Sequence, residues 1–536
     1  MLGTQRLGLP TWMWLSALAP WIWIIPTGQL FWDDWLIFSR VGLQQQIEYW
    51  DNAAKHPLNP VVYSILLPVG AWSFHLLIAL STVASGLAIR AILRGRAFVS
   101  PQAAQVSPAI YLALPVFQAR FSLATLEYSL SLAALLVSWA ILRRRRGALS
   151  EVVSLVLLVY AIGVPSMAIL FPLLWCDIVI ASSTTRTPRG LLRSAVRFCY
   201  IPLVPACFAL AFSTVIDSGD KYQPSVGAIV EFFRGATVLG LLVSGFVIYS
   251  RRRSPQLLSR WGWTIAGAVA TYGAFFPYFA VGYNPLSDFL PWRFRENVIS
   301  AMPDRVMIVL LLTGLMVILG FARRTESKHT SFHTRGLLWL TPVILFGSTL
   351  FVLGPMDWES RHWLVAWPFM TATIVTFISV AKRDEQMRLV RFTFLLLLLP
   401  TILISSEYIV DTLKQRSMMD SIAVELPVDL VVKGNDDSLL HVVLELDSDV
   451  NRLNARHRGY RPYEWAGIIS AGTGIPFDRI EIHELSSINA PEADELKCEG
   501  DSVGIIASPV TNSSFLSSLM TLSVETKWNI EPLSGC

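Results

Sequence analysis

The sequence predicts an α-helical polytopic membrane protein with a small α/β domain at its C-terminal end. Hydrophobic residues make up 53% of the 536 residues and charged residues only 15%, and the mean hydropathy is +0.51. Long apolar runs alternate with short basic segments, and the composition becomes more acidic after about residue 411. A soluble protein this apolar would aggregate, so the expected solvent of the first part of the chain is a bilayer.

The apolar runs predict about thirteen transmembrane helices, since about 20 apolar residues suffice to cross the hydrocarbon of a membrane. Two of the runs, on either side of Val164-Pro165-Ser166, are short enough to be a broken pair that dips only part of the way. The predicted spans are 11–27, 68–93, 103–119, 122–142, 151–164, 166–182, 197–216, 229–250, 261–280, 304–322, 336–354, 363–381 and 392–410.

The basic residues predict the orientation, because Lys and Arg in short loops stay on the cytoplasmic side. They gather in clusters, and the sequence between two neighbouring clusters is long enough for one outward and one inward helix. The clusters are Arg94 and Arg96, Arg143 to Arg146, Arg186 to Arg197, Arg251 to Arg260, Arg323 to Arg335, and Lys382 to Arg391. This pattern predicts a multi-pass protein of a bacterial-type cytoplasmic (inner) membrane, with its N-terminus inside. The loops 28–67, 217–228, 281–303 and 355–362 and the C-terminal end are then outside.

Residues 411–536 predict a mixed α/β domain on the extracytoplasmic side, separate from a transmembrane domain at 1–410. Apolar residues alternate with polar ones in Leu439 to Leu446, which is typical of a strand, and no later segment is long enough to span a bilayer. The spacing of His441, His457 and His483 does not match a metal-binding motif. No metal site is therefore expected in this domain.

The first outer loop contains an acidic pair among aromatic residues, in the segment Phe31-Trp32-Asp33-Asp34-Trp35. A carboxylate at the rim of the bilayer, shielded by aromatic rings and next to a second charge, is suited to act as a general base. The pair could instead hold a divalent metal ion through its oxygens. A purely structural alternative is that Asp34 caps the helix that begins at Trp35.

Several function classes lack their sequence signatures. The chain has no phosphate-binding glycine-rich loop with its Lys, no His-Glu-x-x-His, no Gly-x-Ser-x-Gly and no pair of cysteine couplets. It also lacks a row of acidic residues within the spans, which an ion-coupled transporter often shows. Glu127, near the outer half of the fourth predicted span, is the closest candidate for a buried functional charge.

The arrangement of these features resembles the GT-C superfamily of integral-membrane glycosyltransferases. The resemblance lies in the first helix, the acidic pair Asp33 and Asp34 in the first outer loop, the amphipathic segment Trp35 to Trp50 and about a dozen further spans. It implies a polyprenyl-phosphate-linked sugar as donor, and a catalytic base at Asp33 or Asp34. A second partial match, Glu359-Ser360-Arg361-His362 before the span that begins at Trp363, implies that Arg361 faces the donor phosphate.

Other outer residues fit a lipid-phosphate donor by their chemistry. The guanidinium group can bind two phosphate oxygens at once, and an Arg outside the membrane departs from the positive-inside bias. Arg361 and Arg305 lie closest to helix ends, and His362 adjoins the first of them; snorkelling or a local salt bridge explains such residues equally well. The candidates for contact with the sugar or lining of the pocket are Trp35, His56, Tyr283, Trp292 and Trp358, of which the aromatic ones could also be interfacial anchors.

The sequence therefore predicts an inverting membrane glycosyltransferase that moves a sugar from a polyprenyl-phosphate carrier to a hydroxyl of a cell-envelope glycan, lipid or protein on the outer face. Asp33 is the first choice for the base, Asp34 for orienting the acceptor or a metal, and Arg361 for the phosphate. The main alternative is a transporter or flippase for a lipid-linked glycan, which would bind without chemistry. A polymerase or ligase of another membrane fold, and a structural subunit of an envelope assembly, are further alternatives.

Overall fold

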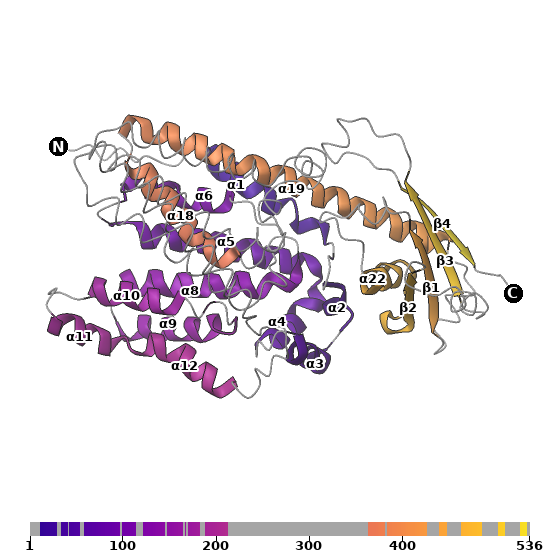
Figure 1. Cartoon of the computed structure of the whole chain (residues 1–536), viewed down its shortest axis with the longest axis horizontal. Coiled ribbons are helices and arrows are strands. Elements are labelled where there is room, and N and C mark those ends of the chain that lie inside the picture. Colours follow the sequence, from indigo (N-terminus) through magenta and orange to yellow (C-terminus); the bar gives the residue numbers. More distant parts are fainter. Residues whose placement is uncertain are drawn as a thin grey trace, which may run out of the picture.

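The computed structural model describes residues 11–28, 30, 34–40, 42–53, 58–96, 99–113, 122–144, 147–164, 167, 170–182, 188–212, 363–380, 383–425, 439–446, 462–484, 502–509 and 526–532. In these ranges the chain is mostly helical, and a four-stranded sheet lies at one end of the helices (Figure 1).

Short helices precede and interrupt the longer ones in the first part of the chain. The elements are α1 (Thr11–Ile22), η1 (Ile25–Thr27), α2 (Asp34–Phe38), α3 (Leu43–Ala53), α4 (Asn59–Leu66), η2 (Leu67–Val69), α5 (Ala71–Leu93), α6 (Pro101–Ala113), η3 (Leu123–Thr125), α8 (Leu126–Arg144), α9 (Ala148–Ala161), α10 (Leu170–Ser182), α11 (Pro188–Arg197) and α12 (Tyr200–Phe212). Helices α18 (Trp363–Val380) and α19 (Arg383–Glu425) follow later in the chain.

Helices α5 and α8 form the centre of the helical bundle and pack against each other. Within the described residues, Ala71–Leu93 and Leu123–Arg144 are the two helical segments long and apolar enough to cross a membrane. At 1.5 Å per residue each measures about 33 Å or more, which matches a hydrocarbon thickness of about 30 Å. Helix α9 packs on α8, and α6 packs on α5, α1, α18 and α19.

Part of the bundle surface is apolar. On α9 the side chains of Leu149, Val152, Val156 and Val159 are all more than half exposed, and their spacing places them on one face of the helix. Leu80 of α5 is also more than half exposed. An apolar face of this extent is unfavourable in water, so it requires lipid or another apolar partner.

One carboxylate, that of Asp177, joins the end of α5 to α8 and α10. Asp177 of α10 accepts hydrogen bonds at Oδ2 from Arg96 (2.8 Å), Trp139 (2.7 Å) and Arg143 (2.6 Å). Arg96 follows the end of α5, and Arg143 lies in the last turn of α8. Two of the basic clusters that the sequence assigns to the cytoplasmic side are therefore at the same end of the bundle.

The sheet at the opposite end contains β1 (Leu440–Leu446), β2 (Ile480–Glu484), β3 (Ser502–Pro509) and β4 (Thr526–Pro532), in the order β2-β1-β3-β4. Strand β1 is parallel to β2 and β3, while β4 is antiparallel to β3. Helix α22 (Pro462–Thr473) lies between β1 and β2 in the sequence. Because two adjacent parallel strands need a crossover connection, α22 is the helix of a βαβ unit.

Helix α22 holds the sheet against the rest of the chain. Its buried side chains Trp465, Ile468 and Ile469 belong to the same hydrophobic core as Leu440 and Val442 of β1. On its other side α22 meets α19, where a Cβ at Gly472 would lie only 2.8 Å from the carbonyl oxygen of Met419. The absence of a side chain at Gly472 lets the two backbones approach this closely.

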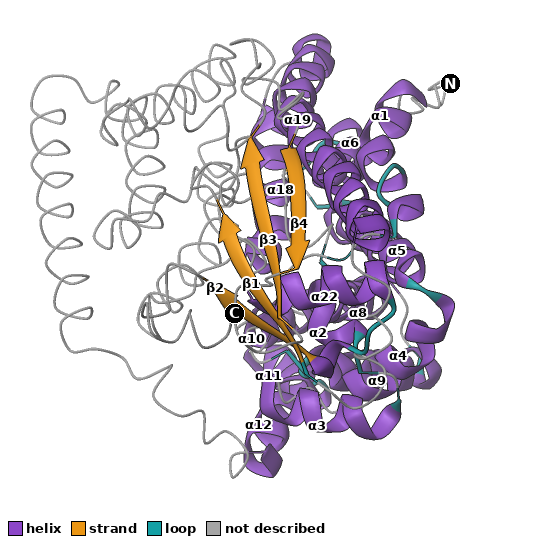
Figure 2. Ribbon diagram, turned by 90° about the vertical axis from the view of Figure 1, so that its right-hand side faces the viewer, coloured by secondary structure: helices purple, strands orange, loops and turns teal. Residues whose placement is uncertain are grey.

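Helix α22 also contacts α2, which begins with Asp34, the second residue of the acidic pair (Figure 2). The indole of Trp35 lies on Gly467, where a Cβ would be 2.4 Å from Cε3 of the ring. Trp35 is only 5% exposed as a result. The loop near the start of the chain and the α/β unit near its end are thus in direct contact.

The structure confirms the mostly helical fold. Two predicted spans, 68–93 and 122–142, coincide with the two candidate membrane-spanning helices. Helices α9 and α10, at 14 and 13 residues, are as short as the sequence indicates. The predicted spans 229–250, 261–280, 304–322 and 336–354 lie outside the described residues, so the total of about thirteen stays a prediction.

Two details differ from the sequence interpretation. The segment 28–67, expected as a loop with one amphipathic stretch, contains three helices, and α2 and α3 are separated at Gly42, whose φ of 138° is unfavourable for other residues. The predicted domain boundary at 410/411 falls inside α19, which continues to Glu425. The standing of 411–536 as a separate extracytoplasmic domain stays a prediction.

The contact of Trp35 with Gly467 can be tested by a double-mutant cycle. Gly467→Ala should lower the free energy of unfolding by about 1–3 kcal/mol, because the added methyl group overlaps the indole. In a Trp35→Ala background the same change should cost less than about 0.5 kcal/mol. Thermal unfolding of the purified protein in detergent measures both. Gly147→Ala is the control, since its Cβ would meet nothing within 4 Å; an equal cost in both backgrounds contradicts the contact.

The Asp177 cluster predicts a large loss of stability from a single substitution. Asp177→Asn should destabilise the protein by about 2–3 kcal/mol, because it leaves two largely buried guanidinium groups without their carboxylate. The matched control is Glu151→Gln, which removes the more exposed ion pair with Arg197 and should cost about 0.5 kcal/mol or less. Chemical or thermal unfolding in detergent compares the two, and similar small losses would show that the cluster contributes little.

Candidate functional site

The candidate site is built around Asp34, the second residue of the acidic pair. Asp34 begins the five-residue helix α2, and its side chain is fully buried. Its Oδ1 accepts hydrogen bonds from the hydroxyl of Ser122 (2.8 Å) and from the backbone N–H of Ala124 (2.9 Å). Two donors from a distant part of the chain therefore fix this carboxylate.

These two donors belong to the turn that starts the helical segment η3–α8. Ser122 precedes η3, and the first N–H groups of a helical segment have no acceptor within it. A negative charge at this end is also favoured by the helix dipole. The sequence interpretation allowed Asp34 to cap its own helix; the two hydrogen bonds described here reach the start of another helix, and so they attach α2 to the segment η3–α8.

A second carboxylate lies one turn further along α8. Glu127 is 6% exposed, and its Oε2 accepts a hydrogen bond from the side-chain amide of Asn59, the buried first residue of α4. Glu127 was the one acidic residue that the sequence indicated as a buried charge. The structure confirms its burial and adds Asn59 as its partner.

Tyr63 is a buried residue on which the charges of both carboxylates act. Its hydroxyl donates to the carbonyl oxygen of Leu123 at 2.6 Å, and its ring packs against Trp50 and Phe74. Burial, followed by the charges of Glu127 and Asp34, raises the pKa of the Tyr63 phenol well above its ordinary value. The phenol therefore stays protonated and acts as a donor, and the two acids that influence it belong to α2 and α8.

The turn between α2 and α3 is also held by side-chain hydrogen bonds. The buried amide of Gln46 donates to the carbonyl oxygens of Ile37 (3.0 Å) and Arg40 (2.8 Å), and it accepts from the indole of Trp50 (3.0 Å). These bonds satisfy backbone groups that the break at Gly42 leaves without helical partners. These bonds thus hold α2 and α3 in a fixed arrangement.

Of the predicted site residues, the structure describes Asp34 and Trp35. Trp35 was expected to contact substrate; it packs on Gly467, and its indole Nε1 is buried with no hydrogen-bond partner among the described residues. The remaining candidates lie outside the described residues: Asp33, His56, Tyr283, Trp292, Arg305, Trp358, Arg361 and His362.

The sequence interpretation missed Ser122, Asn59 and Tyr63. Asn59 is the first residue of α4 and Ser122 directly precedes η3, so a polar residue at a helix start was the signal available for these two; Tyr63 lies in the middle of α4 and gave no such signal. Ser and Asn are so common at helix starts that the pattern does not distinguish a local cap from a bond to another segment. The partners, 60 to 90 residues apart in the chain, become visible only in the fold.

The site is suited to positioning rather than to free proton exchange at Asp34. Two donors already occupy one of its oxygens, and the side chain is removed from solvent. Carboxylates of this kind can hold hard divalent ions. In the part of the chain that the structure describes, however, three potential metal ligands come together on the C-terminal sheet and not around Asp34.

Comparison of the chain with protein families, with curated proteins and with solved structures finds no match.

The hydrogen bonds of Asp34 predict a specific loss of stability. Asp34→Ala should cost about 2–3 kcal/mol, because Ser122 and Ala124 lose the charged acceptor that they share. Asp34→Asn should cost about 1 kcal/mol, since an amide oxygen still accepts but carries no charge. Hydrogen exchange should accelerate at the amide of Ala124 in the alanine variant. The exposed Asp420→Ala is the control; unchanged exchange at Ala124 would contradict the attachment of the loop to α8.

Proposed function

We propose that this chain is an integral-membrane glycosyltransferase that moves a sugar from a polyprenyl-phosphate-linked donor to a hydroxyl of a cell-envelope acceptor, on the outer face of the cytoplasmic membrane. The proposal rests on one observation: two carboxylates, Asp34 and Glu127, are buried in an apolar helical bundle where the charges of both act on Tyr63, and Asp34 directly follows Asp33 in the sequence. Ionisable groups inside a membrane bundle are costly and are therefore typical of functional sites.

Placement in a membrane is supported by the surface of the bundle. Ala71–Leu93 and Leu123–Arg144 have the length and composition of spans, and α9 exposes a continuous apolar face. Helix α11 has no buried side chain and carries Arg189, Arg193 and Arg197 together with exposed Leu192 and Val196. A basic amphipathic helix of this kind is suited to lie in the headgroup region of a membrane.

The outer side is supported by the direction of α8. Glu127 is in its first turn, near Asp34, while Arg143 is in its last turn, at the Asp177 cluster. Glu127 and Arg143 are separated by about 24 Å at the rise of an α-helix. Because basic residues favour the cytoplasmic side, the end with the two buried carboxylates faces the other compartment.

In the proposed reaction the two residues of the acidic pair have different roles. Asp33 accepts the proton of the acceptor hydroxyl as its oxygen attacks the anomeric carbon, and the carbon–oxygen bond to the lipid phosphate breaks on the opposite side. The configuration is thereby inverted. Asp34, already bonded to Ser122 and Ala124, positions the loop and thus Asp33.

The other proposed contacts follow from the chemistry of the donor. Arg361, Arg305 and His362 bind the departing phosphate, whose charge suits a guanidinium fork. Tyr283, Trp292 and Trp358 stack on sugar or lipid, and His56 lines the pocket. A divalent ion near the acidic pair is compatible with this scheme, and the scheme does not require one.

The proposal predicts a defined effect of Asp33→Asn. Transfer of radiolabelled sugar from polyprenyl-phosphate donors by the purified protein in nanodiscs should fall by about 10²–10⁴-fold, which is the usual contribution of a general base. Binding of the donor and the unfolding temperature should be unchanged, because the amide keeps the size of the carboxylate.

The matched control is Glu48→Gln, which neutralises an exposed carboxylate in the same loop and should leave transfer unchanged. Two results would overturn the proposal. One is an equal loss of sugar transfer in Asp33→Asn and Glu48→Gln. The other is a wild-type protein that transfers sugar from no donor but still binds a lipid-linked glycan, which would favour a transporter or flippase.

A further inference from the structure

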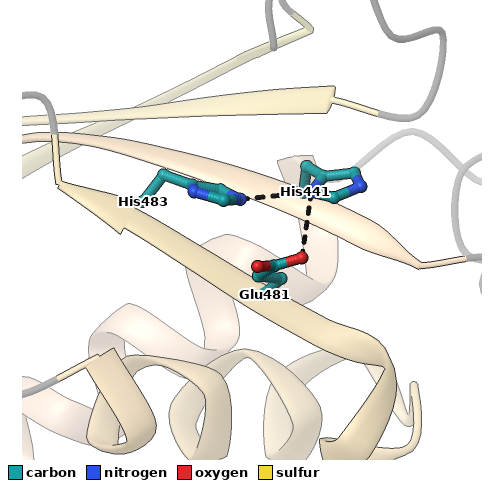
Figure 3. A group of neighbouring side chains, drawn as sticks. All are labelled: His441, Glu481 and His483. Carbon is teal, nitrogen blue, oxygen red and sulfur yellow. Dashed lines mark hydrogen bonds and ion pairs between the residues drawn. The ribbon is translucent and has the colours of Figure 1, made fainter. Parts of the chain in front are cut away.

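Three side chains that can bind metal meet on the C-terminal sheet, although the spacing of the histidines in the sequence gave no reason to expect it. They are His441 on β1 and Glu481 and His483 on the neighbouring strand β2 (Figure 3). His441 pairs with Glu481 in the parallel register, and His483 is two residues further along β2. Side chains two residues apart in a strand point to the same face, so the register brings all three together.

The face that carries these residues is the one turned away from α22. The residues that flank them in the strands point the other way: Leu440, Val442 and Ile480 are buried in the hydrophobic core, and the partly buried Ile482 packs against it. The side chain of His441 is 17% exposed and that of Glu481 is 51% exposed. The cluster is therefore partly shielded but open on one side to solvent.

The distances within the cluster match those between ligands of one ion. The Nδ1 atom of His441 lies 3.1 Å from Nε2 of His483 and 3.4 Å from Oε2 of Glu481, and the three ligand atoms all lie within 4.8 Å of one another. In tetrahedral zinc coordination, with bonds of about 2.0–2.1 Å, adjacent ligand atoms are about 3.3–3.4 Å apart. Small rotations of the side chains would place all three at bonding distance.

Hydrogen bonding alone is a poorer explanation of this geometry. In the absence of an ion, a single proton on Nδ1 of His441 would have to serve both the carboxylate and the second imidazole. If that nitrogen carried no proton, its lone pair would face the negative charge of Glu481. A cation at the point where the three atoms converge satisfies all of them.

We propose that His441, Glu481 and His483 bind a divalent transition-metal ion of the zinc class. Two imidazoles and one carboxylate are ligands that suit Zn²⁺ and do not suit Mg²⁺ or Ca²⁺. Three protein ligands on an open face leave a coordination position for water, as in zinc sites that bind an exogenous ligand. This site is independent of the acidic pair and of the proposed glycosyl transfer.

The site has a structural consequence for the sheet. In the order β2-β1-β3-β4, β2 is an edge strand, and among the described strands it pairs only with β1. An ion held by one residue of β1 and two of β2 would join the edge strand to its neighbour. Because the ion binds the folded form, it should raise the stability of the sheet.

The test is zinc binding by the full chain in detergent after treatment with a chelator. We expect one Zn²⁺ per chain in the wild type, measured by competition with a chromophoric chelator and by elemental analysis. His441→Gln and His483→Gln should each weaken binding by at least about 100-fold, because loss of a direct ligand should cost no less than loss of a supporting residue. Added Co²⁺ should give the visible absorption bands of a low-coordinate site in the wild type and not in these variants.

Asp478→Asn is the matched control for Glu481→Gln, since Asp478 is an exposed carboxylate next to the same strand. Only the change at Glu481 should weaken binding. Zinc should also raise the unfolding temperature of the wild type but not of the histidine variants, which separates metal loss from misfolding. The proposal fails if wild type and the His441→Gln/His483→Gln double variant bind Zn²⁺ with equal stoichiometry and affinity, or if Co²⁺ gives no site spectrum in folded wild type.

Discussion

The attachment of Asp34 to the start of α8 is the interaction on which the described structure depends most. Its carboxylate accepts from Ser122 and Ala124, so a helix of only five residues is fixed to the central pair of the bundle. The next residue, Trp35, lies against Gly467 of α22, and α22 supports the sheet. One buried charge therefore helps to set the position of the loop and, through Trp35, of the α/β unit as well.

The helical character of the chain could be predicted from its sequence because bilayer spans leave a strong local signal. The runs at 68–93 and 122–142 are long and apolar, and helices are found at both. The strand at Leu440 to Leu446 was also visible, since its residues alternate within a stretch of seven. The break at Gly42 was harder to predict, because a glycine in an amphipathic segment is compatible with a continuous helix, a kink or a turn.

The residues around Asp34 could be predicted only in part. Its position between aromatic residues in the first outer loop indicated a special environment, and Glu127 stood out as a charge in an apolar segment. Neither feature of the sequence identifies the residues around these carboxylates, because Ser122, Asn59 and Tyr63 approach them through tertiary contacts. The histidines show the same limit more clearly: His441 and His483 are 42 residues apart, and only the parallel register of β1 and β2 brings them within 3.1 Å.

The length of helix α19 determines how far a bend in it would displace the end that contacts the sheet. It begins beside the bundle, where Thr401 donates to the carbonyl oxygen of Ala113 in α6, and continues without interruption to α22 and β4. Pro400 has no amide hydrogen, so the helix lacks one of its own bonds at this point and bends there most easily. From this pivot to Glu425 the helix measures about 38 Å at its usual rise, so each degree of bending displaces its far end by about 0.7 Å. A bend of a few degrees near Pro400 would therefore move the end of α19 that contacts α22 and β4 by a few ångströms.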